Sequence, residues 1–143
     1  MSTSIKNQIN ETAASLNSLA SMPHPSVGID LDGCVDQAPI FFNLLTNCWK
    51  GKVFVVTYRT DREKSVADLR RYGIKFDELI LVGSFDAKAE AIVENNILFY
   101  FDDQPEMVKH VPSTATVFLV RNEGNFCFDE RLWLFSETTA RLV

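Results

Sequence analysis

The spacing of hydrophobic residues changes repeatedly along the chain, and these changes predict an alternation of strands and helices. Unbroken apolar runs rich in β-branched and aromatic residues are typical of strands that are covered on both faces. Apolar residues three and four positions apart are typical of helices that bury one side. The predicted strands are 27–32, 53–57, 78–82, 97–101 and 116–120. The predicted helices between them are 39–49, 60–71, 86–94 and 105–111.

Two further helices are predicted outside this alternating region. At the N-terminus, apolar residues recur at steps of four and three, which places them on one face of a helix over 1–22. These residues are Ile5, Ile9, Ala13, Leu16 and Ala20. A terminal helix is predicted over 129–142. We therefore expect one domain over 1–143, in which 27–120 is the core that carries the functional residues.

The alternation predicts an α/β fold in which a five-stranded parallel sheet has helices on both faces. This is a three-layer, Rossmann-like architecture. Ligands of such sheets bind at the carboxyl ends of the strands. Polar residues at those ends are therefore the candidates for function.

Composition and charge narrow the classes of function. The chain has 143 residues, 46% of them hydrophobic, which is enough to build a core. A formal charge of −5 argues against a protein that coats nucleic acid or binds membranes through basic residues. The three cysteines lack metal-binding or redox spacing, and no apolar run is long enough to span a bilayer or to form a signal peptide. We expect reduced cysteines and a cytoplasmic setting.

Pairs of carboxylates follow two of the predicted strands. Asp30 and Asp32 end the first strand, and Asp102 and Asp103 follow the fourth. Carboxylates this close together raise one another's pKa or require a cation, and an all-oxygen ligand set suits Mg²⁺. The structural alternatives are a tight Asp-Gly turn for the first pair and a helix cap for the second.

A hydroxyl and an ammonium group stand at two further positions of this kind. Thr57 ends the second strand, and Lys88 lies at the start of the helix before the fourth. Both groups can bind phosphoryl oxygens. Taken singly, Thr57 would be an ordinary strand residue and Lys88 a solvated surface lysine, so both assignments depend on their order relative to the acids.

Taken in chain order, the first acid pair, the threonine, the lysine and the second acid pair resemble the four motifs of the haloacid-dehalogenase-like (HAD) superfamily. Asp30-Leu31-Asp32-Gly33 matches the first motif, D-x-D-G after an apolar strand. Thr57 matches the second motif, Lys88 the third, and Asp102-Asp103 the fourth. The resemblance extends over 27–120 and implies the HAD-like form of the Rossmann-like fold.

The resemblance also implies a reaction, the Mg²⁺-dependent hydrolysis of a phosphomonoester through an aspartyl phosphate. Asp30 would be the nucleophile, and Asp32 the general acid and base. Mg²⁺ would be bound by Asp30, the backbone carbonyl of Asp32 and Asp102, with Asp103 completing or orienting the set. The phosphoryl oxygens would be held by Thr57 and Lys88.

Two places depart from the common form of the family. Cys34 follows the first motif, where Thr or Val is common, and Tyr58 precedes Arg59, where a small residue is common. Neither removes a catalytic group. They bear on the choice of substrate, because Tyr58 and Arg59 would stand beside the phosphate site.

Two other functions stay open. A response-regulator receiver also combines acids, Thr and Lys on a five-stranded parallel sheet, but its phosphoacceptor follows the third strand. Here the third strand ends Leu81-Val82-Gly83-Ser84, without an acid. A non-catalytic phosphate-binding domain on the same fold is the other alternative.

The short connections leave no room for a cap domain, which many HAD-like enzymes insert near the site. Only 20 residues (33–52) separate Asp32 from the second strand, and 30 residues (58–87) separate Thr57 from Lys88. We expect an open site for a phosphorylated small molecule or for an exposed phosphate on a macromolecule. Self-association through the N-terminal helix stays open.

Overall fold

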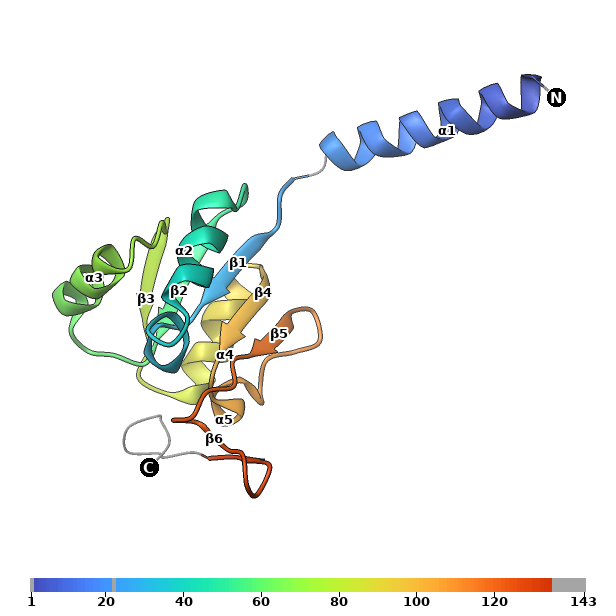
Figure 1. Cartoon of the computed structure of the whole chain (residues 1–143). Helices are drawn as coiled ribbons and strands as arrows, with labels where there is room; N and C mark the ends of the chain where they lie inside the picture. The colour runs from blue at the N-terminus through green and yellow to red at the C-terminus, as the bar shows by residue number, and fades with distance from the viewer. Residues whose placement is uncertain (1, 22, 135–143) are drawn as a thin grey trace.

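The computed structural model describes residues 2–21 and 23–134 and contains a five-stranded parallel sheet (Figure 1). The strand order is β3-β2-β1-β4-β5. The strands are β1 (Ser26–Ile29), β2 (Val53–Thr57), β3 (Glu78–Leu81), β4 (Ile97–Asp102) and β5 (Thr116–Leu119). Each coincides with a predicted strand to within three residues at either end. The predicted Rossmann-like α/β fold is confirmed.

Four helices alternate with these strands. They are α2 (Pro39–Cys48), α3 (Arg62–Arg71), α4 (Phe85–Glu94) and α5 (Pro105–Val108). The side chains of Asp61 and Ser84 accept hydrogen bonds from backbone N–H groups and cap α3 and α4. The last helix ends at Val108, before the predicted end at 111, and Pro112 disfavours helical geometry in Val111. Residues 33–52 and 58–87 contain no inserted domain, as expected.

Two apolar clusters attach the helices to opposite faces of the sheet. On one face, Phe42 of α2 and Leu69 of α3 pack against β1, β2 and β3. On the other, Ile92 of α4 packs with Tyr100 of β4 and with β2. Each such fully buried side chain stabilises the fold by about 1.5–3 kcal/mol. A Cβ at Gly28 would lie 2.8 Å from the Tyr100 ring, so glycine at this position lets that ring pack against β1.

The N-terminal helix α1 (Ser2–Ser21) projects away from the sheet (Figure 1). The helix predicted in this region is present, and its apolar residues are exposed where the structure describes them. Ile5 and Ile9 are 56% and 61% exposed. Within 2–21 and 23–134, none of the helices has the length and hydropathy needed to cross a bilayer.

The chain after β5 differs from the prediction. β6 (Phe126–Cys127) and β7 (Leu132–Trp133) form a small antiparallel pair. The predicted helix over 129–142 is therefore wrong for 129–134, and 135–143 lie outside the described residues. Aromatic contacts explain the difference, because the Phe126 ring packs 5.2 Å from Trp133 across the pair. Arg131, with φ of 55°, takes a left-handed conformation that interrupts a helix.

Candidate metal centre

Three buried aspartates meet at the carboxyl edge of the sheet. Asp30 follows β1, Asp102 is the last residue of β4, and Asp103 comes next. β1 and β4 are neighbours, and the Asp30 N–H donates to the Phe101 carbonyl at 2.9 Å. One carboxylate oxygen from each aspartate lies within 4.8 Å of the others. The side chains of this group, which we call the aspartate cluster, could hold a metal ion.

Lys88 lies against the aspartate cluster from the first turn of α4. Its Nζ is 2.7 Å from Asp102 Oδ2 and 3.3 Å from Asp30 Oδ2, and the residue is fully buried. Three ionised carboxylates and one ammonium group leave two negative charges. Burying an unbalanced charge of this size is costly, and a divalent cation would cancel it.

The pKa values of the cluster show the same imbalance. Burial raises the pKa of Asp30 to about 7, although the nearby Lys88 opposes the shift. Burial, together with the charges of Asp30 and Asp102, raises the pKa of Asp103 to about 8. Burial lowers the pKa of Lys88, but the two carboxylates beside it outweigh this effect and the net pKa is raised. Without a cation, the cluster therefore retains protons near neutral pH.

Several polar atoms around the cluster are buried without a hydrogen-bond partner among the described residues. They are Thr57 Oγ1, Asp103 Oδ1 and Gln104 Oε1. The Thr57 hydroxyl is close enough to the Asp30 carboxyl to favour its charged form, although it makes no hydrogen bond of good geometry. An unpaired buried acceptor costs about 1–3 kcal/mol. The unpaired carboxylate oxygen therefore fits a site for an oxygen-binding cation such as Mg²⁺.

Both carboxylate oxygens of Asp102 accept hydrogen bonds. Its Oδ1 accepts from the Gln104 N–H at 2.9 Å, and its Oδ2 accepts from Lys88. The Tyr100 hydroxyl lies 3.0 Å from both Asp102 Oδ2 and the Val56 carbonyl, and its single proton can be donated to either. These contacts fix the orientation of the Asp102 carboxylate.

Asp32 was predicted at this site, but its side chain lies outside the aspartate cluster. The Arg59 guanidinium donates to both of its oxygens at 2.7 Å and to Asp68 at the same distance. Hydrogen bonds from Arg59 lower the pKa of Asp68, and the pKa of Arg59 is raised. In this structure Asp32 is therefore paired with Arg59 and is not one of the three aspartates whose oxygens lie within 4.8 Å of one another.

The turn after β1 carries Asp32 and brings Gly33 against Asp103. Residues Leu31–Val35 form an irregular helical turn, η1, in which Gly33 has φ of 76°. A Cβ at Gly33 would overlap the Asp103 carboxyl group. Glycine therefore permits both the left-handed backbone and the close approach of Asp103. The neighbouring Cys34 is buried, and burial raises the pKa of its thiol, which makes it a poor nucleophile.

Two asparagines that the sequence analysis did not select connect the loops of the site. Asn125 Nδ2 donates to the carbonyls of Asp103 and Val120 at 3.0 and 2.7 Å. Asn122 Nδ2 donates to the Gly33 carbonyl at 2.8 Å. These asparagines could have been selected from the sequence, because they form an Asn-x-x-Asn segment just after the fifth predicted strand, at the edge of the sheet where ligands bind.

Comparisons of the chain with protein-family models, with curated proteins and with solved structures found no match. The class of the protein therefore follows from its own geometry. It is a five-stranded parallel α/β protein with a buried three-aspartate cluster at the carboxyl ends of β1 and β4.

Proposed function

We propose that the chain is a Mg²⁺-dependent phosphomonoester hydrolase of the HAD-like superfamily. The observation that supports this most is the meeting of Asp30, Asp102, Asp103 and Lys88 at one edge of the sheet. These residues come from the first, third and fourth motifs of the resemblance. When its three carboxyls are ionised, the cluster with Lys88 has a net charge of two negative units, which suits a divalent cation and, with the cation bound, a phosphoryl group.

Asp30 is the nucleophile in this proposal. One of its oxygens forms a bond to phosphorus while the ester oxygen departs with its electron pair and takes up a proton. Water then attacks the phosphorus atom and gives a proton to Asp32, the bond to Asp30 breaks, and inorganic phosphate leaves. The Leu31 N–H donates to Asp30 Oδ1 at 2.7 Å, which orients the carboxylate. Mg²⁺ held by Asp30, Asp102 and Asp103 would supply positive charge to the phosphoryl oxygens.

Two other residues support the phosphoryl group. The hydroxyl of Thr57 is buried near Asp30 at the end of β2 and can donate to a phosphoryl oxygen. Lys88 lies behind the carboxylates with no exposed surface, so its main effect is to stabilise their ionised forms. Protonation of the leaving oxygen is assigned to Asp32, which must first exchange its contacts with Arg59 for contacts with the substrate.

The contact between Asp32 and Arg59 also favours a second candidate, a phosphate-binding module without catalysis. An acid held by two hydrogen bonds from a guanidinium is not available as a proton donor. If that contact persists when phosphate binds, the cluster would retain phosphate together with Mg²⁺ but would not turn over an ester.

The test measures hydrolysis of p-nitrophenyl phosphate and of a panel of nucleoside monophosphates, sugar phosphates, phosphopeptides and phosphate-ended oligonucleotides. We expect Mg²⁺-dependent turnover that Asp30→Asn reduces by about 10³-fold or more without loss of folding. Asp86→Asn is the matched control, because its side chain is 77% exposed and lies outside the aspartate cluster. Full activity of Asp30→Asn would show that the nucleophile is wrong. Phosphate binding without any turnover would support the second candidate.

A further inference from the structure

A pocket lined by lysines lies at the amino edge of the sheet, opposite the edge that carries the aspartate cluster. It has a volume of about 390 Å³, and its charged and aromatic lining residues are His24, Trp49, Lys50, Lys52, Lys75 and Asp77. We call this cavity the basic pocket. Cavities of about 300–1,000 Å³ are typical of sites for small molecules. The basic pocket is therefore large enough for a ligand built from several linked groups.

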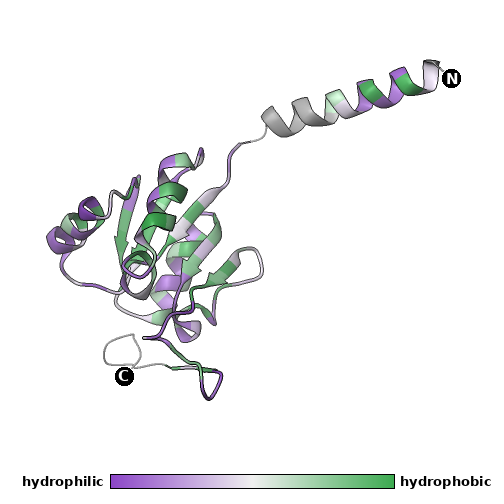
Figure 2. Cartoon of the chain, viewed as in Figure 1, coloured by the Kyte–Doolittle hydropathy of each residue, from purple (hydrophilic) through white to green (hydrophobic). Residues whose placement is uncertain are grey.

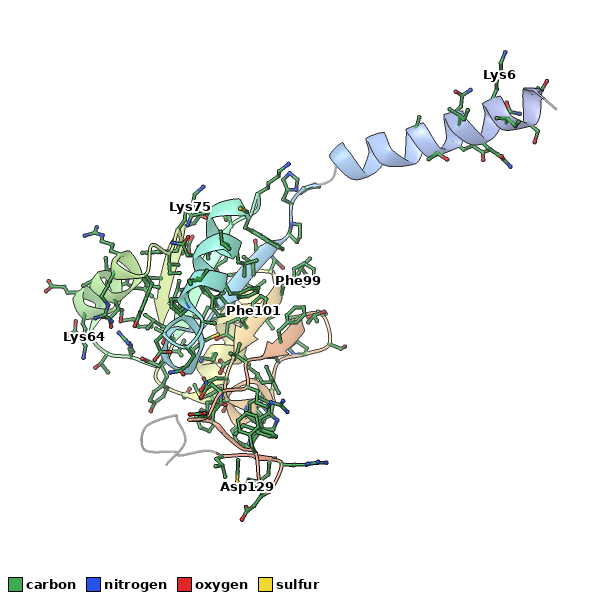
Figure 3. All side chains as sticks on the ribbon, viewed as in Figure 1. Lys6, Lys64, Lys75, Phe99, Phe101 and Asp129 are labelled. Carbon is green, nitrogen blue, oxygen red and sulfur yellow. The ribbon has the colours of Figure 1, made fainter. Side chains whose placement is uncertain are left out.

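The strand order assembles the basic pocket from three separate segments. Residues 23–25, 49–52 and 75–77 come directly before β1, β2 and β3, and these strands are neighbours in the sheet. Because the strands are parallel, their amino ends meet at one edge. Figure 2 shows hydrophilic positions at this edge, in the loop after α2 and at the start of β3. Figure 3 shows Lys75 and Asp129 at opposite ends of the body.

Backbone contacts hold the segments of the basic pocket together. The Trp49 Nε1–H donates to the Pro25 carbonyl at 2.8 Å. The Val53 N–H donates to Asp77 Oδ2, and the Asp77 N–H donates to the Val53 carbonyl, both at 2.8 Å. A Cβ at Gly51 would overlap the Pro25 carbonyl oxygen, so glycine lets the segment before β2 approach the segment before β1. The three segments therefore have fixed relative positions without a ligand.

The basic pocket has an excess of positive charge. Three lysines and one aspartate line it, which sums to two positive charges, and the His24 imidazole is a further nitrogen donor. Within 2–21 and 23–134, none of the three lysines forms an ion pair. The Asp77 carboxylate is already engaged by the Val53 N–H. A chain whose net charge is −5 thus gathers unpaired ammonium groups around one cavity, and an anion with two or more charges would neutralise them.

We propose that the basic pocket binds a polyphosphate chain, either free or carried by a nucleotide. Lysine ammonium groups attract phosphate oxygens as point charges, so three of them suit a ligand whose negative charge is spread over several phosphate groups. A single carboxylate would neutralise only one of the three. The half-buried indole of Trp49 also lines the pocket, and it is an aromatic ring on which the base of a nucleotide can stack.

The test is calorimetric titration of the full chain with tripolyphosphate, in EDTA at low ionic strength and about pH 8.5. EDTA leaves the aspartate cluster without a cation, so the negative charge of the cluster repels the probe and binding there is disfavoured. We expect one tripolyphosphate bound per chain, with an affinity that falls as salt is added. None of these measurements depends on phosphatase activity.

Paired substitutions locate the bound tripolyphosphate. Lys50→Gln with Lys52→Gln should weaken binding by about 10-fold or more, because two exposed ammonium groups no longer contact the phosphate oxygens. Lys64→Gln with Lys109→Gln is the matched control, because it removes the same charge from exposed lysines outside the basic pocket. It should change the affinity by less than about 3-fold. Circular dichroism checks that each variant is folded.

A second titration, with adenosine triphosphate, separates the two sources of the ligand. Equal affinity for both probes supports recognition of the phosphate chain alone, and tighter binding of adenosine triphosphate supports a nucleotide. No binding of either probe would overturn the proposal, as would an equal loss in the control pair or no loss in the Lys50 and Lys52 pair. Tighter binding of a single-stranded oligonucleotide than of both probes would also overturn it, since the ligand would then be a macromolecule. Every measurement uses the full chain, so residues 22 and 135–143 are present throughout.

Discussion

Binding of Mg²⁺ to the aspartate cluster should release protons at neutral pH and should weaken as the pH falls. With pKa values of about 7 for Asp30 and about 8 for Asp103, the first carboxyl is about half protonated at pH 7 and the second about nine-tenths. A cation that binds the ionised forms must displace these protons. The expected release is between one and two protons for each Mg²⁺ bound. At about pH 5.5 both carboxyls are protonated, Lys88 balances Asp102, and little attraction for a cation remains.

Calorimetric titration with MgCl₂ at pH 7, in two buffers of different ionisation enthalpy, measures the number of protons directly. Asp103→Asn removes one titrating group and should reduce the release to below one proton. Thermal unfolding gives a second measurement. At a Mg²⁺ concentration of about 100 times Kd, the stabilisation is about 2.7 kcal/mol, or a rise in Tm of roughly 8 °C. Tight binding with no proton release, or equal stabilisation at about pH 5.5 and 8.5, would refute the charge assignment.

Three further predictions follow from the same geometry. In EDTA, the free energy of unfolding should fall as the pH rises through about 7 to 8, because Asp30 and Asp103 then lose protons whose binding had stabilised the folded state. Urea titrations at several pH values measure this free energy, and a rise over the same range would contradict the prediction. Gly33→Ala should abolish Mg²⁺ stabilisation, since a Cβ there displaces the Asp103 carboxyl group, and the strain should add about 1–2 kcal/mol of destabilisation. Asn125→Ala should weaken Mg²⁺ binding about 10–100-fold by releasing the Asp103 backbone. Arg59→Gln, which breaks a contact outside the cluster, should leave that affinity within about 3-fold; a similar loss in both variants would show that the Asn125 contact has no specific effect.

The sheet and most of the cluster could be predicted because both depend on local sequence. An apolar run such as 53–57 is buried only in a strand that is covered on both faces of the sheet. Parallel strands that end in acidic residues bring those residues to the same edge of the sheet. The positions of Asp30 and Asp102 follow from this rule alone, and the register Ile29 to Phe101 confirms that they end side by side. That these two acids, with Asp103, share one buried site agrees with the prediction.

The orientation of Asp32 could not be predicted in the same way. It depends on Arg59, which is 27 residues away in sequence and reaches Asp32 only after β2 has paired with β1. The small strand pair after β5 has the same origin, because helical spacing over 129–134 gives way to a contact between the rings of Phe126 and Trp133. In both cases a tertiary contact between groups distant in sequence decides a feature that local patterns leave undetermined.

The charges of the cluster also set the order in which ligands would bind. Assigning all four aspartates to the metal would leave the rest of the chain nearly neutral, but Asp32 is balanced by Arg59 in the structure. When they are ionised, the remaining three acids and Lys88 sum to two negative charges, which a divalent cation cancels and a monovalent cation does not. A phosphate dianion that arrived first would meet the negative charge of the cluster without compensation. In the proposed reaction Mg²⁺ therefore binds before the substrate, and Asp32 must leave its contact with Arg59 before it can act as an acid.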